Sequence, residues 1–152
     1  MPEKPMNETD AVRGDMETRV TLLKQAETLT ERLAEALKAG DEALAAKLLE
    51  LRRVMFEKVD RINAKLEETE SQSALKSPPV RAEASESIDE LRAEARAVVS
   101  RILESDKASI ELIRLEQTRI ASELHRLHQG LKARKAYYGE RAFDPRFLDK
   151  LK

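Results

Sequence analysis

The sequence predicts an all-α fold, an elongated antiparallel bundle or coiled coil of three helices. The third helix is about twice as long as either of the others, and a short C-terminal helix or tail follows it. Residues 87–136 hold one glycine and no proline, and apolar residues recur at helical spacing through residues 15–69. Aromatic residues are only 3 % of the chain, with no Trp and four Gly, so the composition argues strongly against a sheet with hairpin turns. Helices therefore account for the whole core.

The long helix, residues 87–136, shows an apolar face when it is aligned on an eleven-residue period. Eleven residues make three turns, so the face stays aligned on a nearly straight helix about 75 Å long. The aligned rows are Ile88, Val99, Ile110 and Ala121; Leu91, Ile102, Ile113 and Leu124; and Val98, Ser109, Ile120 and Leu131.

The part of the chain before the long helix predicts a helical hairpin. Residues 1–14 are expected to be a disordered lead-in, and Asp15 to cap a first helix that ends at Gly40. Asp41 is the expected N-cap of the second helix, so residues 15–69 form the hairpin. Residues 70–86 then read as a linker, because their periodicity is lost and they contain a Pro-Pro pair. The spacing leaves open whether the third helix runs parallel or antiparallel to the second.

The difference in length between the helices is the main functional indication. The first two helices are each about 40 Å long, so they cover only about half of the third. The uncovered apolar stripe is expected to bind a partner protein. The predicted partner-binding residues are Ile113, Ile120, Leu124, Leu127 and Leu131.

Polar residues follow the edge of this face, in a row formed by Ala95, Asp106, Gln117 and His128. They either set the register of a helical seam or lie at its solvated rim, and the sequence leaves both readings open. His125 and His128 are three residues apart, but Ser122 stands where a di-metal helix motif needs Glu. No metal site and no cofactor are predicted.

The composition of the chain limits the classes of protein to which it can belong. There are 28 basic and 29 acidic residues, so no global field marks a nucleic-acid or membrane partner. Cys is absent, no apolar run reaches membrane-spanning length, and the N-terminus is too polar for a secretory signal. No nucleophile, metal or phosphate-loop motif is present, so the sequence predicts a cytoplasmic protein that is not an enzyme.

The tail, residues 137–152, differs from the rest of the chain. Residues 125–152 hold eight Lys or Arg against three Asp or Glu, a local charge of +5. Because aromatic residues often dominate contact surfaces, the tail either contacts a partner or folds back over the uncovered stripe. Four of the five aromatic residues lie in it, namely Tyr137, Tyr138, Phe143 and Phe147.

The stretch ILESDKASIELIRLEQTRIASELHRLHQGLKARKAYYG, residues 102–139, resembles the flagellar export chaperones of the FlgN and FliT type. The shared features are an Ile-x-x-x-Asp step at Ile102 and Asp106, the long amphipathic helix, a Gly-Leu-Lys pattern and the closing Tyr pair. The hairpin break at Gly40 is also similar to those proteins.

The resemblance implies a chaperone that holds the C-terminal amphipathic helix of a late export substrate, a hook-filament junction or filament cap protein. It also implies an export gate component as second partner, contacted by Tyr137 with Tyr138 beside it. Two alternatives stay open. One is a structural or adaptor homodimer that buries the stripes. The other is nucleic-acid binding by Lys132, Arg134, Lys135 and Arg141, although the segment is short and no groove accompanies it.

Overall fold

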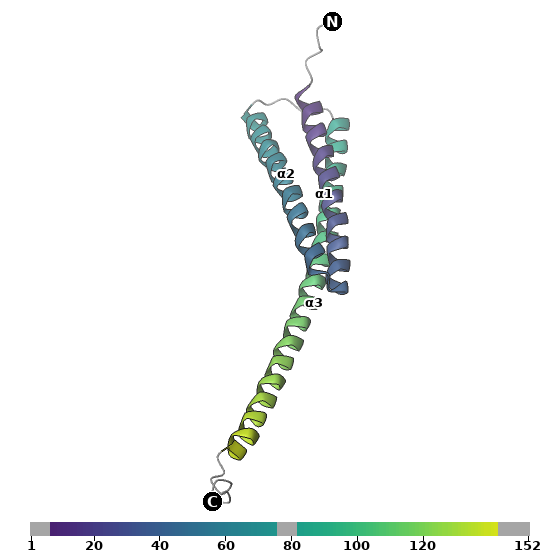
Figure 1. The fold of residues 1–152 in the computed structure, drawn as a ribbon. Coiled ribbons are helices and arrows are strands. Elements are labelled where there is room, and N and C mark those ends of the chain that lie inside the picture. Colours follow the sequence, from purple (N-terminus) through teal and green to yellow (C-terminus); the bar gives the residue numbers. More distant parts are fainter. Residues whose placement is uncertain (1–6, 76–81, 143–152) are drawn as a thin grey trace, which may run out of the picture. The chain divides into compact units, whose positions relative to one another are not determined.

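Three α-helices make up the part of the chain that the computed structural model describes, residues 7–75 and 82–142 (Figure 1). Helix α1 runs over Glu8–Ala39, α2 over Glu42–Leu75 and α3 over Ala82–Ala142. They contain 32, 34 and 61 residues, respectively. The all-α class and the length of the third helix, nearly twice that of the others, are confirmed.

Helices α1 and α2 are joined by a tight turn at Gly40. Its φ of 71° is the left-handed conformation, which glycine adopts without the steric cost that a Cβ would bring. The amide of Asp41 donates to the carbonyl of Ala36 (3.0 Å), which closes α1. The Asp41 carboxylate accepts the amide of Leu44 (3.0 Å), so Asp41 is the N-cap predicted for α2.

The chain forms two units, residues 1–110 and 111–152. In the first unit, the ion pairs between helices define the topology. Lys24 pairs with Glu94 (2.5 Å) and Glu27 with Arg101 (2.5 Å), so α3 runs parallel to α1. Arg52 pairs with Asp106 and Glu70 with Arg92, so α3 runs antiparallel to α2. These pairs settle the direction that the sequence left open.

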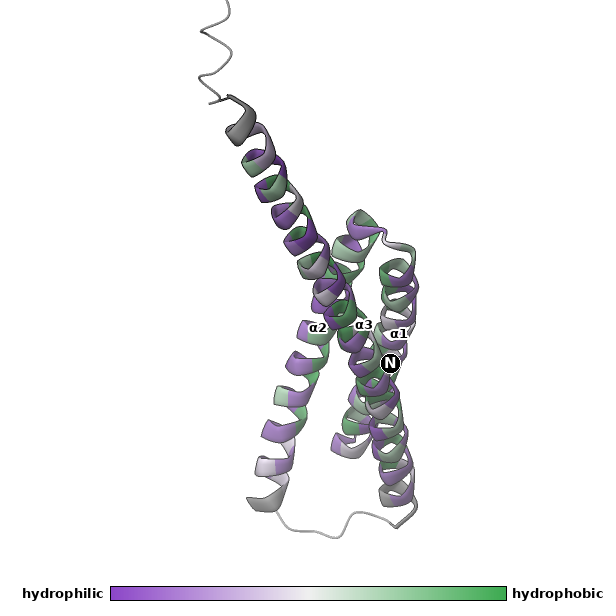
Figure 2. Ribbon diagram, turned by 90° about the horizontal axis from the view of Figure 1, so that it is seen from below, coloured by the Kyte–Doolittle hydropathy of each residue, from purple (hydrophilic) through white to green (hydrophobic). Residues whose placement is uncertain are grey.

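The core of the first unit consists of two clusters of small and medium-sized apolar side chains. The central cluster joins all three helices, and the second packs α1 against α2 beside the Gly40 turn. Figure 2 shows hydrophobic and hydrophilic residues interleaved along each helix, as expected for helices that bury one face only. The central cluster contains Val20, Leu23, Ala26, Val59, Ala95, Val98 and Ile102, and the second contains Leu33, Ala36, Ala45 and Leu48.

The face that α3 buries differs slightly from the aligned rows. Ala95, assigned to the polar edge, is buried, and Val98 is fully buried. Val99, assigned to the apolar face, is 37 % exposed. The buried line is therefore Ala95, Val98 and Ile102, because a small residue at position 95 lets the helices approach where a larger one would separate them.

The predicted start of the first helix is wrong. The structure begins α1 at Glu8, so residues 8–14 of the expected lead-in are helical, and Gly14 lies inside the helix. Asp15 is not a cap; its carboxylate pairs with Lys65 on α2 (2.8 Å). Contacts with α2 outweigh the roughly 1 kcal/mol that an interior glycine costs, and acidic residues in the first turn suit the helix dipole.

The other boundaries also shift outward. Helix α2 continues to Leu75 and α3 begins at Ala82, so both ends of the expected linker 70–86 are helical. The polar residues there lack an apolar period but are compatible with a helix. Helix α3 extends past residue 136 to Ala142, so the tail begins as helix. Its remainder, with Phe143, Phe147 and the expected short final helix, lies outside the described residues.

Candidate functional site

The candidate site is a line of residues along the part of α3 after residue 109, which we call the α3 stripe. Its apolar members are exposed, with exposed fractions between 39 % for Ile113 and 63 % for Leu127. The five predicted partner-binding residues all belong to it. The α3 stripe consists of Ile110, Ile113, Gln117, Ile120, Leu124, Leu127 and Leu131.

The spacing of the α3 stripe is a seven-residue repeat. Its members follow one another by three and four residues in strict alternation, from Ile110 to Leu131. This is the a/d pattern by which one helix packs against another in a coiled coil, and Gln117 is its only polar position. The eleven-residue alignment of the whole helix did not detect it, because that period spread these residues over several rows.

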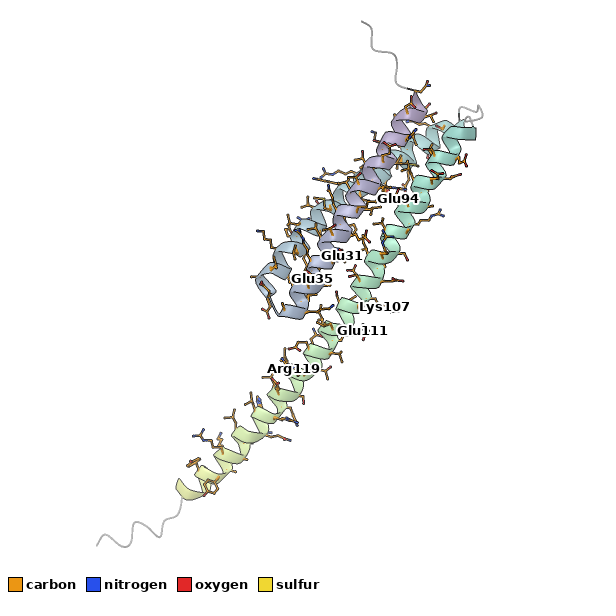
Figure 3. All side chains as sticks on the ribbon, turned by 90° about the vertical axis from the view of Figure 1, so that its right-hand side faces the viewer. Glu31, Glu35, Glu94, Lys107, Glu111 and Arg119 are labelled. Carbon is orange, nitrogen blue, oxygen red and sulfur yellow. The ribbon has the colours of Figure 1, made fainter. Side chains whose placement is uncertain are left out.

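Ion pairs on the other faces of this segment stabilise its helix, although the segment packs against no core. Glu111 pairs with Arg114 (3.1 Å), and Arg119 pairs with Glu116 (2.5 Å), each three residues apart. Such pairs stabilise a helix by a few tenths of a kcal/mol each. Glu111 and Arg119 are labelled on this stretch of α3 in Figure 3. The segment thus holds its apolar residues in line while they stay open to solvent.

Leu115 provides an internal comparison for the α3 stripe. It is 72 % exposed, yet it lies nine residues from Leu124, which at 100° per residue is the opposite side of the helix. A single exposed leucine is ordinary on protein surfaces, whereas seven aligned positions are not. The alignment, rather than exposure alone, therefore marks the site.

The tyrosine pair follows the α3 stripe on the same helix. The rings of Tyr137 and Tyr138 meet edge to face, with centroids 5.7 Å apart, and both side chains are exposed. The guanidinium of Arg134 lies over the Tyr138 ring, 5.7 Å from its centroid. The aromatic and basic groups are thus neighbours, as cation–π contacts require.

The predicted polar row divides between the two units. Asp106 is partly buried in the first unit, where its carboxylate accepts two hydrogen bonds from Arg52, one of 2.7 Å. Such a pair favours one alignment of α2 against α3, so at this position the register interpretation describes the geometry better than a solvated rim. Gln117 and His128 are exposed.

A groove in the first unit was missed by the sequence analysis. It encloses about 610 Å³ and is lined by all three helices, with Leu66 and Val99 among its apolar residues and Arg19, Arg92 and Arg96 among its basic ones. Burial is the main cause that lowers the pKa of Arg19, and the charge of Arg92 lowers it further. Arg19 donates to the amide oxygen of Asn63 (3.2 Å). Only the packing of three helices brings these residues together, so no motif could reveal the groove.

Across residues 7–75 and 82–142, no helix combines the length and apolarity needed to cross a membrane. In the same part of the chain, no three His, Cys, Asp or Glu side chains gather as a metal site would require.

The fold and the site define the class as an all-α helical bundle whose longest helix presents an exposed heptad stripe. Comparisons of the chain with models of protein families, with curated proteins and with solved structures find no match. The resemblance to flagellar export chaperones therefore stays a prediction from the sequence.

Proposed function

We infer that the protein is a cytoplasmic helix-binding chaperone of the flagellar export type. In this proposal, the α3 stripe holds the C-terminal amphipathic helix of a hook-filament junction or filament cap protein. The observation that carries the proposal is the exposed seven-residue repeat from Ile110 to Leu131. The proposed activity is binding alone, with no chemical step and no cofactor.

The energetics support a helix as the ligand. A helix laid along the α3 stripe would remove six exposed apolar side chains from water, and each fully buried side chain of this size is worth about 1.5–3 kcal/mol. Gln117 would then lie inside the seam, where a partner without a matching polar group leaves it unsatisfied. Burial of the apolar side chains would provide the affinity, and Gln117 would disfavour partners bound in the wrong register.

The second partner in the proposal is a component of the export gate, contacted by Tyr137 and Tyr138. Exposed, rigid aromatic side chains are frequent anchors of protein interfaces. Their place beyond Leu131 leaves the α3 stripe free for the substrate, so both partners could be held at once. Replacing both tyrosines by alanine should then weaken gate binding and leave substrate capture unchanged.

The test of the substrate site compares two leucines of the same helix. Leu124→Asp should abolish capture of the recombinant junction and cap proteins in a pull-down, since it places a charge in the seam. Leu115→Asp is the matched control on the opposite side and should capture them as the unaltered chain does. Equal capture by both variants, or no capture by the unaltered chain, would contradict the proposal.

A second candidate function, a coiled-coil homodimer, is favoured by the symmetry of the stripe. In an antiparallel pair centred between Leu124 and Leu127, each of these leucines meets the other in the second copy, and Ile120 meets Leu131. Light scattering at micromolar concentration distinguishes the two. A dimer that stays intact when substrate is added would favour this candidate, and a monomer would exclude it.

A further inference from the structure

The charges beside the α3 stripe differ between its two ends. Near its N-terminal end, residues 111–123 carry two basic and three acidic side chains, and these neutralise one another within the helix. Arg114 pairs with Glu111, and Arg119 pairs with Glu116 (2.5 Å) and Glu123 (3.7 Å). This end of the stripe therefore presents little free charge to a partner.

The C-terminal end of the stripe carries uncompensated positive charge. No Asp or Glu occurs between Glu123 and Glu140, while Arg126, Lys132, Arg134 and Lys135 lie in that interval, a net +4 with His neutral. Across the described residues none of the four forms an ion pair. The two ends of one continuous apolar line thus differ in electrostatic character.

Three of these basic residues surround Leu131. Arg134 follows Leu131 by three residues and so continues the spacing of the α3 stripe, whereas Lys132 lies about 100° to one side of Leu131. Lys135 follows one turn later on nearly the same side as Leu131 itself. Arg126 points to the far side of the helix. A helix seated on Leu131 would therefore meet cations at this end of the stripe, in line with it and along one edge.

The helix dipole does not account for this cluster. Its influence is confined to the last turn of a helix, whereas Lys132 and Lys135 precede Ala142 by ten and seven residues. A second copy of the chain is a poor occupant as well. A parallel copy would bring two basic clusters together, and an antiparallel copy would offer carboxylates that are already paired.

A nucleic-acid strand would match the charge but not the surface. Leu127 and Leu131 are 63 % and 61 % exposed, and both lie in line with four other apolar residues, whereas the exposed aromatic rings, Tyr137 and Tyr138, come only after that line. The combination of an apolar line with cations at one end is the complement of an amphipathic helix that is acidic at one end.

We propose that the helix bound by the α3 stripe carries acidic side chains beside its apolar face at one end only, and that this end sits at Leu131. The proposal rests on the function proposed above and adds the polarity of the partner. The uncharged end of the partner then lies along Ile110 and Ile113, so the ligand binds in a single direction.

The test uses the full chain and three synthetic amphipathic peptides of about 21 residues with identical apolar a and d positions. The e and g positions of the last heptad hold Glu in the first peptide, Gln in the second and Lys in the third. Fluorescence anisotropy should give roughly tenfold tighter binding of the Glu peptide than of the Gln peptide, since its two carboxylates add exposed charge contacts of modest strength. Raising the salt concentration should remove most of this difference.

Substitutions in the chain test which basic residues cause the preference for the Glu peptide. The triple change Lys132→Gln, Arg134→Gln and Lys135→Gln should equalise the Glu and Gln peptides, whereas Arg126→Gln, on the far side, should preserve the preference. Circular dichroism verifies that each variant keeps its helix content. Loss of the preference in Arg126→Gln as well would overturn the assignment of the acidic end to Leu131.

Two outcomes separate this inference from the proposed function. Equal affinities for all three peptides, abolished by Leu124→Asp, would overturn the charge polarity and leave helix binding intact. Failure of every peptide, or tighter binding of a single-stranded oligonucleotide, would overturn the inference, while the capture of export substrates decides the function independently.

Discussion

The guanidinium of Arg52 on α2 and the carboxylate of Asp106 on α3 form a bidentate ion pair. Only 14 % of the Arg52 side chain and 27 % of the Asp106 side chain are exposed. The same guanidinium lies over the Phe56 ring, 5.1 Å from its centroid. The pair joins residues 54 positions apart in the sequence, close to the end of the first unit. It therefore fixes where α3 stands along α2.

Removing one member of this pair should destabilise the first unit. Asp106→Ala leaves a partly buried cation without its partner, and we expect a loss of about 1.5–3 kcal/mol in the free energy of unfolding by urea. Glu111→Ala, which removes an exposed ion pair within α3, is the control and should cost less than about 0.5 kcal/mol. Replacing both Arg52 and Asp106 by Leu should recover most of the loss. Equal effects of the two single changes would contradict a structural role for the pair.

Replacing Gly40, in the turn between α1 and α2, and Gly14, inside α1, by alanine should have opposite effects on stability. Gly40→Ala places a Cβ on a left-handed residue, and we expect it to lower stability by about 1 kcal/mol. Gly14→Ala, within α1 and with open space around the new methyl group, should raise stability by about 0.5–1 kcal/mol. Thermal unfolding of both variants measures the difference. A rise in stability with Gly40→Ala would show that the left-handed turn is not formed.

Two adjacent valines test which side of α3 faces the core. Val98 is fully buried in the central cluster, so Val98→Ala should cost about 2 kcal/mol through lost packing and a residual cavity. Val99→Ala, at a position 37 % exposed, should cost less than about 1 kcal/mol. Urea unfolding followed by circular dichroism gives both values. A larger cost for Val99→Ala than for Val98→Ala would contradict the burial of Val98 in the central cluster.

Acid should weaken the contact between α1 and α3. Arg101 donates two hydrogen bonds to Glu27, of 2.5 Å and 3.3 Å, and this hydrogen bonding is the main cause that lowers the pKa of the Glu27 carboxyl. Because the folded pKa lies below the unfolded value of about 4.3, the stabilisation is complete above that pH and is lost as pH falls through the folded pKa.

Glu27→Gln should therefore lower the melting temperature at neutral pH and reduce its further fall below about pH 4.3. Glu35→Gln is the control, an exposed carboxylate on the same helix that forms no ion pair within residues 7–75 and 82–142 (Figure 3). Melting curves between neutral and acid pH provide the comparison. An unchanged pH dependence in Glu27→Gln would show that this contact does not contribute.

The turn at Gly40 and the apolar residues of the α3 stripe could be predicted from the sequence, because residues close together in the chain determine both. Gly40 followed by Asp41 supplies the end of one helix and the cap of the next. The five apolar residues from Ile113 to Leu131 share one side of any helix that forms there. The start of α1 at Glu8 could not be predicted, because its neighbours on α2, such as Ser73 beside Glu8 (3.4 Å), are far away in the sequence.

The sequence by itself determined that the chain is helical, that the third helix is nearly twice as long as its companions, and that an aligned apolar line continues beyond residue 110. Tertiary structure decided that α3 runs parallel to α1, that Val98 rather than Val99 enters the core, and that Asp106 meets Arg52. The physical reason is the distance along the chain over which each interaction acts. Periodicity and capping act within a few turns of a helix, whereas direction, burial and pairing depend on residues that only the packing of separate helices brings into contact.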